Sequence, residues 1–272
     1  MRVQMLGLCR FSYLGMRGYQ REHASIEDRR AFLYDPARLQ RRWFWFRNVA
    51  LPALTVQSDP DFTLVIMTGP DLPEPWLGRL RRLCDQHPQF RLALLPPMDR
   101  HLDACLAAIA PQIDRDADVI GHFRHDDDDA IAFDYIERAR ADFAPVAGLW
   151  ADRGRQLCVD HARGIMADVR GGDLTLTPRI CHNMGVAMTL FLPPDLDRTA
   201  LHFEHWKVSA WMPNVQIPAP PMFLRLIHQD ADSGSMGAGF AWDATPERLA
   251  ALLPERFGID PTRLIEGARR FA

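Results

Sequence analysis

Several features that identify common classes of protein are missing from this 272-residue sequence. It has no excess of positive charge, since its formal net charge is -3, so broad nucleic-acid binding has little electrostatic support. No apolar run approaches the roughly 20 residues that span a bilayer. The N-terminus also lacks the apolar core and cleavage site of a signal peptide. We expect a cytoplasmic protein without a transmembrane segment, and peripheral contact with a membrane stays open.

Cysteine and lysine are scarce. The sequence contains five cysteines and no Cys-x-x-Cys pair: Cys9, Cys84, Cys105, Cys158 and Cys181. An odd, dispersed set is typical of reduced thiols that are buried as small apolar side chains. Arginine far outnumbers lysine, and its planar guanidinium suits phosphate and carboxylate groups. A GC-rich genome would produce the same bias, so this composition alone does not indicate a phosphate site.

Apolar segments are plentiful, and in the first half of the chain they alternate between two kinds. Short continuous apolar runs predict buried strands at 3–11, 62–69, 90–97 and 117–123. Longer segments with helical spacing predict helices at 35–57, 73–87, 102–114 and 131–143. Asp35 and Pro36 are a typical N-cap and first helical residue, and Pro52 is expected to end or kink that helix. Short connections between such elements predict a mostly parallel sheet flanked by helices.

The alternation weakens beyond about residue 145. Shorter strands are expected in three segments: 148–160, 173–193 and 219–228. Two terminal helices are expected at 245–259 and 261–272. The sequence contains no internal repeat, no low-complexity tract and no convincing linker. We therefore expect one α/β domain with two halves, residues 1–145 and a mixed α+β half of residues 146–272.

Four consecutive aspartates, Asp126 to Asp129, follow the strand predicted at 117–123. Ligands of parallel sheets bind at the carboxyl ends of strands, and Mg²⁺ takes one or two carboxylates together with phosphate oxygens and water. Alternate residues of an extended chain point the same way, so Asp126 and Asp128 can share a side. Asp129 can begin the next helix as a cap or first-turn residue. The pattern predicts a Mn²⁺ or Mg²⁺ site, and a solvated acidic turn is the alternative.

This layout resembles glycosyltransferases of the GT-A fold, in which an Asp-x-Asp element ends a central strand and holds the divalent ion of a sugar nucleotide. More narrowly, "RFSY" (10–13), the segment 34–69 and "RHDDDDAIAFDYI" (124–136) resemble the bacterial rhamnosyl transferase family. The resemblance covers roughly the first 145 residues well and the remainder loosely. It supports the reaction class more than it supports rhamnose as the donor sugar.

The resemblance implies a GT-A-like, Rossmann-like fold and a metal-dependent hexosyltransferase. Residues 1–145 would bind a nucleotide-diphospho-sugar, and residues 146–272 would bind a glycan, a lipid-linked compound or another hydroxyl acceptor. Two alternatives stay open. One is a Mg²⁺-dependent phosphohydrolase or phosphotransferase with an aspartate nucleophile, and the other is a non-catalytic carbohydrate-binding protein. Against the phosphohydrolase, the aspartates follow the fourth predicted strand instead of the first.

Carried over residue by residue, the resemblance assigns Asp126 and Asp128 to the metal ion, with Asp129 beside them and His228 as a further metal or diphosphate contact. The residues assigned to the donor are Arg10, Phe11, Ser12, Thr68, Asp71, Arg124 and Asp127. The sequence has Thr-Gly-Pro-Asp at 68–71, where the family pattern more often has an acidic residue directly at the strand end. Core packing is the alternative for Phe11, and an ordinary ion pair is the alternative for Arg10 and Arg124.

The second half contains one compact group of ionisable residues in "HFEHWK" (202–207). Its spacing does not match a zinc motif. A carboxylate or an imidazole beside the acceptor hydroxyl can act as the general base, and we predict Glu204 first and His205 second. The alternative is an exposed polar start of a helix. Asn183, in "NMGVAM" (183–188), is a candidate to bind sugar hydroxyls, with core packing as the alternative for that segment.

Overall fold

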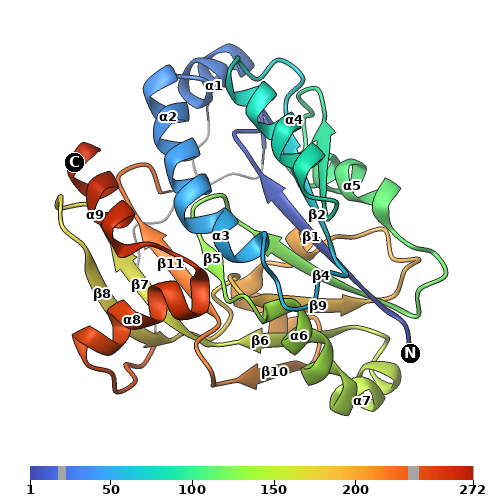
Figure 1. The fold of residues 1–272 in the computed structure, drawn as a ribbon. Helices are drawn as coiled ribbons and strands as arrows, with labels where there is room; N and C mark the ends of the chain where they lie inside the picture. The colour runs from blue at the N-terminus through green and yellow to red at the C-terminus, as the bar shows by residue number, and fades with distance from the viewer. Residues whose placement is uncertain (18–22, 232–238, 272) are drawn as a thin grey trace.

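The computed structural model describes residues 1–17, 23–231 and 239–271, and Figure 1 shows its fold. Its larger sheet has the strand order β10-β6-β9-β4-β1-β2-β3. The bounds of these strands are β1 Val3–Arg10, β2 Thr63–Thr68, β3 Phe90–Leu94, β4 Val119–His125, β6 Leu157–His161, β9 Met188–Leu192 and β10 Asn214–Ile217. Strand β9 runs antiparallel to β4 and β6, and the other neighbours pair in parallel. This confirms the predicted α/β class and the mostly parallel sheet.

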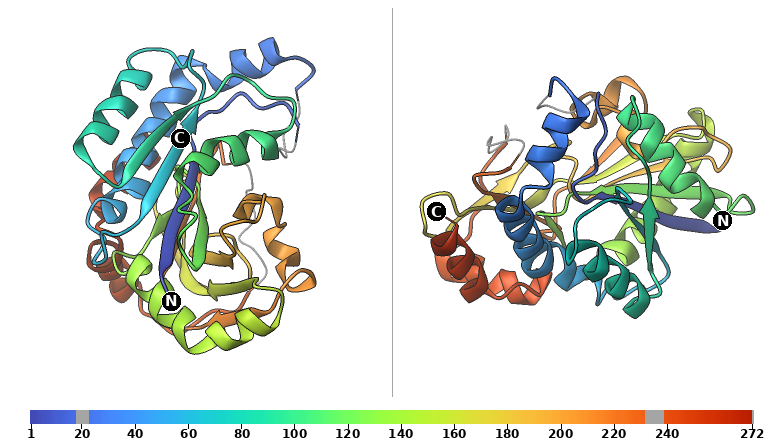
Figure 2. Two further views of the ribbon diagram at one scale, coloured as in Figure 1. Left: turned by 90° about the vertical axis from the view of Figure 1, so that its right-hand side faces the viewer. Right: turned by 90° about the horizontal axis from the view of Figure 1, so that it is seen from above.

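Helices cover both faces of this sheet (Figure 2). Helix α5 packs on one face, where its Ala104 and Cys105 contact the cluster that contains Leu6 and Leu8 of β1. Helices α2, α3, α4 and α6 pack in the cluster of the opposite face. Their bounds are α2 Pro36–Trp45, α3 Leu51–Leu54, α4 Trp76–Gln86, α5 His101–Ile109 and α6 Tyr135–Phe143. Burial on both faces explains why β1, β2 and β4 were predictable as continuous apolar runs, whereas β3 is an edge strand of which only Phe90 is buried.

The helix predicted at 35–57 begins as expected. The Asp35 carboxylate accepts a hydrogen bond from the backbone N–H of Arg38 at 2.8 Å, and Pro36 is the first helical residue. Pro52 does not end the helix, because a π-helical turn, η1 (Phe46–Ala50), precedes it and α3 continues to Leu54. In that turn the N–H of Leu51 bonds to the carbonyl of Phe46, five residues back. This wider turn lets the helical path continue through the proline.

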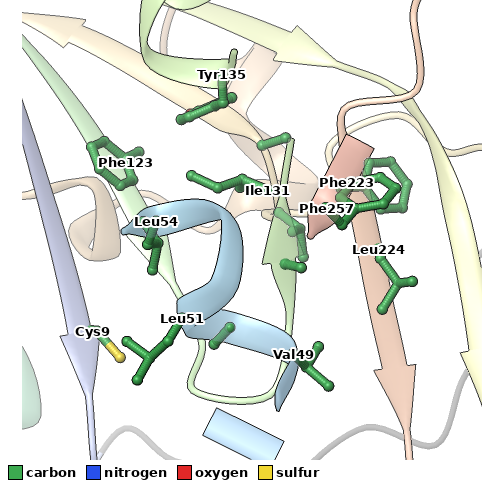
Figure 3. Packing of buried hydrophobic residues seen from close by; sticks show 14 of the residues in the cluster. Cys9, Val49, Leu51, Leu54, Phe123, Ile131, Tyr135, Phe223, Leu224 and Phe257 are labelled. Carbon is green, nitrogen blue, oxygen red and sulfur yellow. The ribbon is translucent and has the colours of Figure 1, made fainter. Parts of the chain in front are cut away.

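A second sheet has the strand order β5-β11-β7-β8. Its strands are β5 Ala130–Ile131, β7 Arg163–Asp168, β8 Thr175–Ile180 and β11 Phe223–Ile227. Figure 3 shows Leu54 of α3 in one packed cluster with Phe123 of the larger sheet and Ile131 of the smaller one. The predicted terminal helices are present as α8 (Pro246–Phe257) and α9 (Pro261–Arg270). Because β4 leads directly to β5, the four aspartates connect the two sheets.

Two predictions about secondary structure were wrong. The segment 131–143 was expected to be helical throughout, but Ile131 ends β5, which pairs with β11, and α6 begins at Tyr135. The segment 148–160 was expected to be a strand, but it begins inside helix α7 (Ala147–Asp152), and only 157–160 lie in a strand, β6. The buried Trp150 fixes α7, since its indole N–H donates to the carbonyl of Phe191 at 3.1 Å. Tertiary packing therefore overrides weak local signals in both places.

The two predicted halves of the chain share both sheets. Strands β6, β9 and β10 of the second half extend the sheet that β1 to β4 begin, and β5 of the first half pairs with β11 of the second. In residues 1–17, 23–231 and 239–271, no helix has both the length and the apolarity to cross a membrane.

Candidate active site

The carboxyl ends of the parallel strands lie at one edge of the larger sheet. Ordered across that edge, β2 is followed by β1, β4, β9, β6 and β10. Leu8 packs against α5, and Arg10, two residues later at the end of β1, points to the same face. The same alternation brings Arg124 of β4 and Asp160 of β6 to this face. Polar groups from both halves of the chain therefore line one edge.

Asp126 lies between two arginines at the end of β4. One carboxylate oxygen accepts from the Arg124 guanidinium at 2.6 Å, and the other accepts from Arg10 at 3.2 Å. Burial acts to raise the pKa of Asp126, but the charges of Arg124 and Arg10 outweigh it and hold this pKa well below its usual range. Asp126 is therefore ionised at neutral pH.

Asp127 and Asp128 share a third arginine, Arg42 of α2. The Arg42 Nε donates to Asp127 at 3.1 Å, and its Nη1 donates to Asp128 at 2.9 Å. Asp128 also contacts the Nε2 of His228, 2.9 Å away, at the end of β11. Burial acts to raise the pKa of Asp128, but Arg42 and the His228 hydrogen bond lower it below its usual range. Asp128 and His228, which the resemblance had assigned to one ion, are thus in direct contact.

Asp129 does not begin a helix as expected. Its carboxylate is buried and accepts the backbone N–H of Leu226 in β11 at 3.1 Å, while the N-cap position of α6 is Asp134. Burial and the charge of Asp128 raise the pKa of Asp129 well above its usual value. Asp129 therefore acts as a link from the aspartate connection to the second sheet.

The four aspartates are not a solvated acidic turn, because Asp127, Asp128 and Asp129 are each at most 8% exposed. Within the described part of the chain, no group of three or more His, Cys, Asp or Glu side chains is arranged to hold a metal ion. Asp126 and Asp128 nevertheless offer ionised, hard oxygens. Such a pair fits the one or two carboxylates that Mg²⁺ takes when phosphate oxygens and water complete its coordination.

The contact of Arg10 with His101 was not predicted. His101, the first residue of α5, is buried and its Nε2 lies 2.9 Å from Nη1 of Arg10. Burial, followed by the charge of Arg10, lowers the pKa of His101 to about 3. His101 is therefore neutral and can accept a hydrogen bond from Arg10. The two residues are 91 positions apart, and no local pattern in the sequence indicates the pairing.

Three other residues predicted to contact the donor are buried. Phe11 has no exposed surface and packs against Trp43 and Phe46, with ring centroids 6.1 and 5.4 Å away, which favours the core alternative. Ser12 has a φ of 47° and accepts from Arg38 of α2 at 3.3 Å. Thr68 ends β2 and is fully buried.

Asp71 lies beside an open hollow after β2. The hollow has a volume of about 500 Å³ and is lined by Glu27, Arg30, Ala31, Tyr34, Asp35, Pro36, Asp71 and Pro73. The Tyr34 hydroxyl donates to the Asp71 carboxylate at 3.2 Å, and Arg30 of α1 (Ile26–Leu33) forms an ion pair with it. This volume falls in the range of small-molecule sites. The sequence indicated Asp71 but not its two partners.

The two predicted bases lie in different surroundings. The Glu204 carboxylate is 47% exposed and pairs with Lys207 at 2.7 Å. The Nδ1 of His205, the first residue of η5 (His205–Ala210), lies 2.5 Å from the carbonyl oxygen of Asn183. Burial, and then the charge of Arg124, lowers the pKa of His205, whereas Asp126 acts to raise it. His205 is therefore within electrostatic reach of Asp126 and Arg124.

A carbonyl oxygen can only accept a hydrogen bond, so the bond to Asn183 places the proton of neutral His205 on Nδ1. Nε2 then carries the free lone pair. Among the predicted residues, the structure brings six together: Arg10 and Arg124 pair with Asp126, Arg42 pairs with Asp127 and Asp128, and His228 contacts Asp128. His205 forms its hydrogen bond with Asn183 instead, but the charges of Arg124 and Asp126 act on it.

The parallel sheet with this polar edge agrees with the GT-A-like glycosyltransferase class that the resemblance implied. A family model described as "Putative rhamnosyl transferase" matches residues 4–239. The chain belongs to this family of glycosyltransferases. A search of curated proteins found no match to the chain.

Solved structures similar to this chain include S. aureus TarS 1–349, at a TM-score of 0.42 and 10% identity, covering 82% of this chain and 60% of that one. S. aureus TarS 1–349 in complex with UDP has a TM-score of 0.41 and 9% identity, covering 100% of this chain and 70% of that one. This chain thus matches 60% of the length of the first of these structures.

Proposed function

We propose that this protein transfers a sugar from a nucleotide-diphospho-sugar to a hydroxyl group of a glycan or lipid-linked acceptor. The observation that carries the proposal is the cluster of ionised aspartates and arginines at the carboxyl end of β4, the edge at which parallel sheets bind phosphorylated ligands. Arginines from β1, α2 and β4 converge there, and the family membership of the chain supports the same reaction class.

The donor would lie across the edge in the order of the strands. The hollow beside Asp71, after β2, would hold the nucleoside, with Tyr34 and Arg30 as additional contacts. The diphosphate would then reach β1 and β4, where Arg10 and Arg124 carry the positive charge. Guanidinium groups bind phosphate oxygens through charge-assisted hydrogen bonds. Both arginines pair with Asp126, so a bound diphosphate would compete for them.

A divalent cation, Mn²⁺ or Mg²⁺, would be held by Asp126 and Asp128, with His228 beside them. Once bound, such an ion stabilises the negative charge that develops on the leaving diphosphate. Arg42 would orient the Asp128 carboxylate, because it contacts both Asp127 and Asp128. Asp129 would hold the connection in place through its bond to β11.

His205 would act as the general base in an inverting transfer. Its Nε2 would take the proton of the acceptor hydroxyl while that oxygen bonds to the anomeric carbon, and the bond from this carbon to the diphosphate oxygen breaks. The low pKa of His205 keeps the imidazole neutral at pH 7, which is the form that can accept a proton. Glu204 is the weaker candidate, because its carboxylate is paired with Lys207.

An assay of nucleoside diphosphate release tests the proposal. Purified protein would be incubated with UDP-, dTDP- and GDP-sugars and Mn²⁺, with and without simple glycosides as acceptors. We expect nucleoside diphosphate release from at least one donor, and release of phosphate from simple phosphate esters would instead indicate a phosphohydrolase. No release under either condition would contradict the proposed transfer. Glu255→Gln, which removes an exposed carboxylate on α8, is the matched control for changes at the aspartates.

A further inference from the structure

The loop between β8 and β9 contains a second polar network at the same edge. The loop ends where β9 begins, and β9 lies between β4 and β6 (Figure 1). The end of the loop is therefore one strand spacing, about 5 Å, from β4, the strand that leads to the aspartates. Asn183 is the centre of the network. It has a left-handed backbone, with a φ of 56°, and three other elements contact it.

The backbone of Asn183 is held on both sides. Asp160 of β6 is fully buried, and its carboxylate accepts the N–H of Asn183 at 2.6 Å. His205 donates to the carbonyl of the same residue at 2.5 Å. A side chain at Gly185 would place its Cβ 3.2 Å from Cγ of His205, closer than ordinary contact. The loop is thus shaped to receive the imidazole ring.

The side-chain amide of Asn183 is oriented by two donors. Its Oδ1 accepts from Asn214 at 2.6 Å and from Gln216 at 3.3 Å, both in β10. The oxygen of Gln216 faces Nδ1 of His182 at 2.7 Å, which is consistent with this orientation. An amide oxygen only accepts and an amide nitrogen only donates. The Nδ2 of Asn183 therefore keeps two N–H groups, and among the described residues neither donates a hydrogen bond to a protein atom.

We infer that Asn183 and His205 form the subsite for a sugar of the acceptor. The Nδ2 of Asn183 donates to one hydroxyl oxygen of the sugar, and the Nε2 of His205 accepts from the hydroxyl that reacts. A hydrogen-bond donor and a hydrogen-bond acceptor that are both held in place through Asn183 match two adjacent hydroxyl groups on a sugar ring. Trp206 adds apolar surface there, since it is 59% exposed and its ring centroid is 4.9 Å from that of His205. The inference rests on the proposed transfer reaction.

Binding of simple sugars tests this subsite without turnover. Methyl glycosides of glucose, mannose and rhamnose would be titrated into the 272-residue chain, and side-chain amide and imidazole resonances would be followed by NMR, with propan-1-ol as the control ligand. We expect at least one glycoside to shift the Asn183 amide and His205 signals, while propan-1-ol shifts neither. The Asn183 amide signal is assigned by its loss in Asn183→Gly, a change that keeps the left-handed backbone favourable.

In Asn183→Gly we expect the affinity for the same glycoside to fall at least tenfold, while nucleoside diphosphate binding stays within twofold of wild type. Asn183→Asp, which keeps the size but replaces the N–H donors with an oxygen, should weaken glycoside binding similarly. Unchanged glycoside affinity in both variants, or the absence of shifts at Asn183 and His205, would overturn the subsite. If glycosides bind there but no donor releases its nucleoside diphosphate, the proposed reaction fails and the carbohydrate subsite stands.

Discussion

The two sides of the sheet edge satisfy their polar groups in different ways. At β1 and β4, buried carboxylates are neutralised by guanidinium groups from three elements. At β6, β9 and β10, amides and imidazoles form a network around Asn183, with Asp160 as its buried carboxylate. Charged groups that can exchange ion-pair partners suit a diphosphate, whereas fixed, neutral hydrogen-bond donors and acceptors suit hydroxyl groups. Under the proposed function, the sugar donor would bind on the first side and the acceptor on the second.

The two sides of the edge also differ in the free energy that is lost when one interaction is removed. Removing one partner of a buried ion pair leaves an uncompensated charge, which costs about 3–5 kcal/mol. Losing one neutral hydrogen bond leaves an unsatisfied group and costs about 1–3 kcal/mol. Changes on the aspartate side should therefore affect stability and catalysis more than changes in the Asn183 network.

The largest effect is expected from Asp128→Asn. The change keeps the size of the side chain but removes the ionised oxygens that contact Arg42 and His228. By analogy with the loss of a single electrostatic group in other enzymes, nucleoside diphosphate release should fall by roughly 10²–10³-fold. The measurement is the initial rate with saturating donor, and the control is Glu255→Gln. A rate within threefold of wild type would remove Asp128 from the site.

The next effect concerns stability. Arg42→Met should lower the free energy of unfolding by about 3–5 kcal/mol, because it leaves Asp127 and Asp128 without their shared cation in a buried setting. Lys207→Met removes an exposed partner of Glu204 and should change it by at most about 1 kcal/mol. Urea unfolding of both variants gives the comparison. If both variants lose the same free energy of unfolding, the buried cluster contributes no more to stability than the exposed ion pair, which would contradict this prediction.

His205→Gln should reduce transfer by roughly a hundredfold and leave donor binding intact, since the base acts on the acceptor. Glu204→Gln should stay within a few-fold of wild type. The pKa of His205 is lowered by burial and by Arg124, so the wild-type rate should fall only at pH values below the usual histidine pKa of about 6.5. In His205→Gln, this fall in rate at low pH should disappear. If it persists in the variant, the base is another group.

The smallest effect is expected from Asp160→Asn, and it depends on pH. Burial raises the pKa of Asp160 to about 6, so the native state holds this proton at pH values where the unfolded chain has released it. Asp160 therefore makes the native state less stable as pH rises from about 4 to about 6, and the effect is constant above that range. As the pH rises from about 4 to about 6, the free energy of unfolding of the wild type should fall relative to that of the variant. A pH-independent difference would contradict the raised pKa.

Much of the fold could be predicted from local sequence. Strands β1, β2 and β4 are continuous apolar runs because these central parallel strands are buried on both faces. Asp35 with Pro36 marks the start of α2 through a cap that spans only three residues. Helix α7 was missed because six residues are too few to establish helical periodicity, and its Trp150 is fixed by a contact with Phe191, 41 positions away.

The site was predictable only in part, for a related reason. The aspartates are adjacent in sequence, so their grouping was visible, but the partners that neutralise them are not. Arg42 and Asp127 are 85 positions apart, and His101 and Arg10 are 91 apart, so these contacts depend on the packing of α2 and α5. The sequence placed Glu204 ahead of His205, and only the fold distinguishes an exposed carboxylate from an imidazole bonded to Asn183.

The most direct test of the central claim is a crystal structure with a nucleoside diphosphate and Mn²⁺, with the metal located by its anomalous scattering. We predict the diphosphate at the carboxyl ends of β1 and β4 in contact with Arg10 or Arg124, the nucleoside in the hollow beside Asp71, and a Mn²⁺ peak next to Asp128. The Asn183 side of the edge should remain open for the acceptor. A nucleotide bound elsewhere, or one that covers Asn183 and His205 and leaves the aspartates paired only with arginine, would contradict the account.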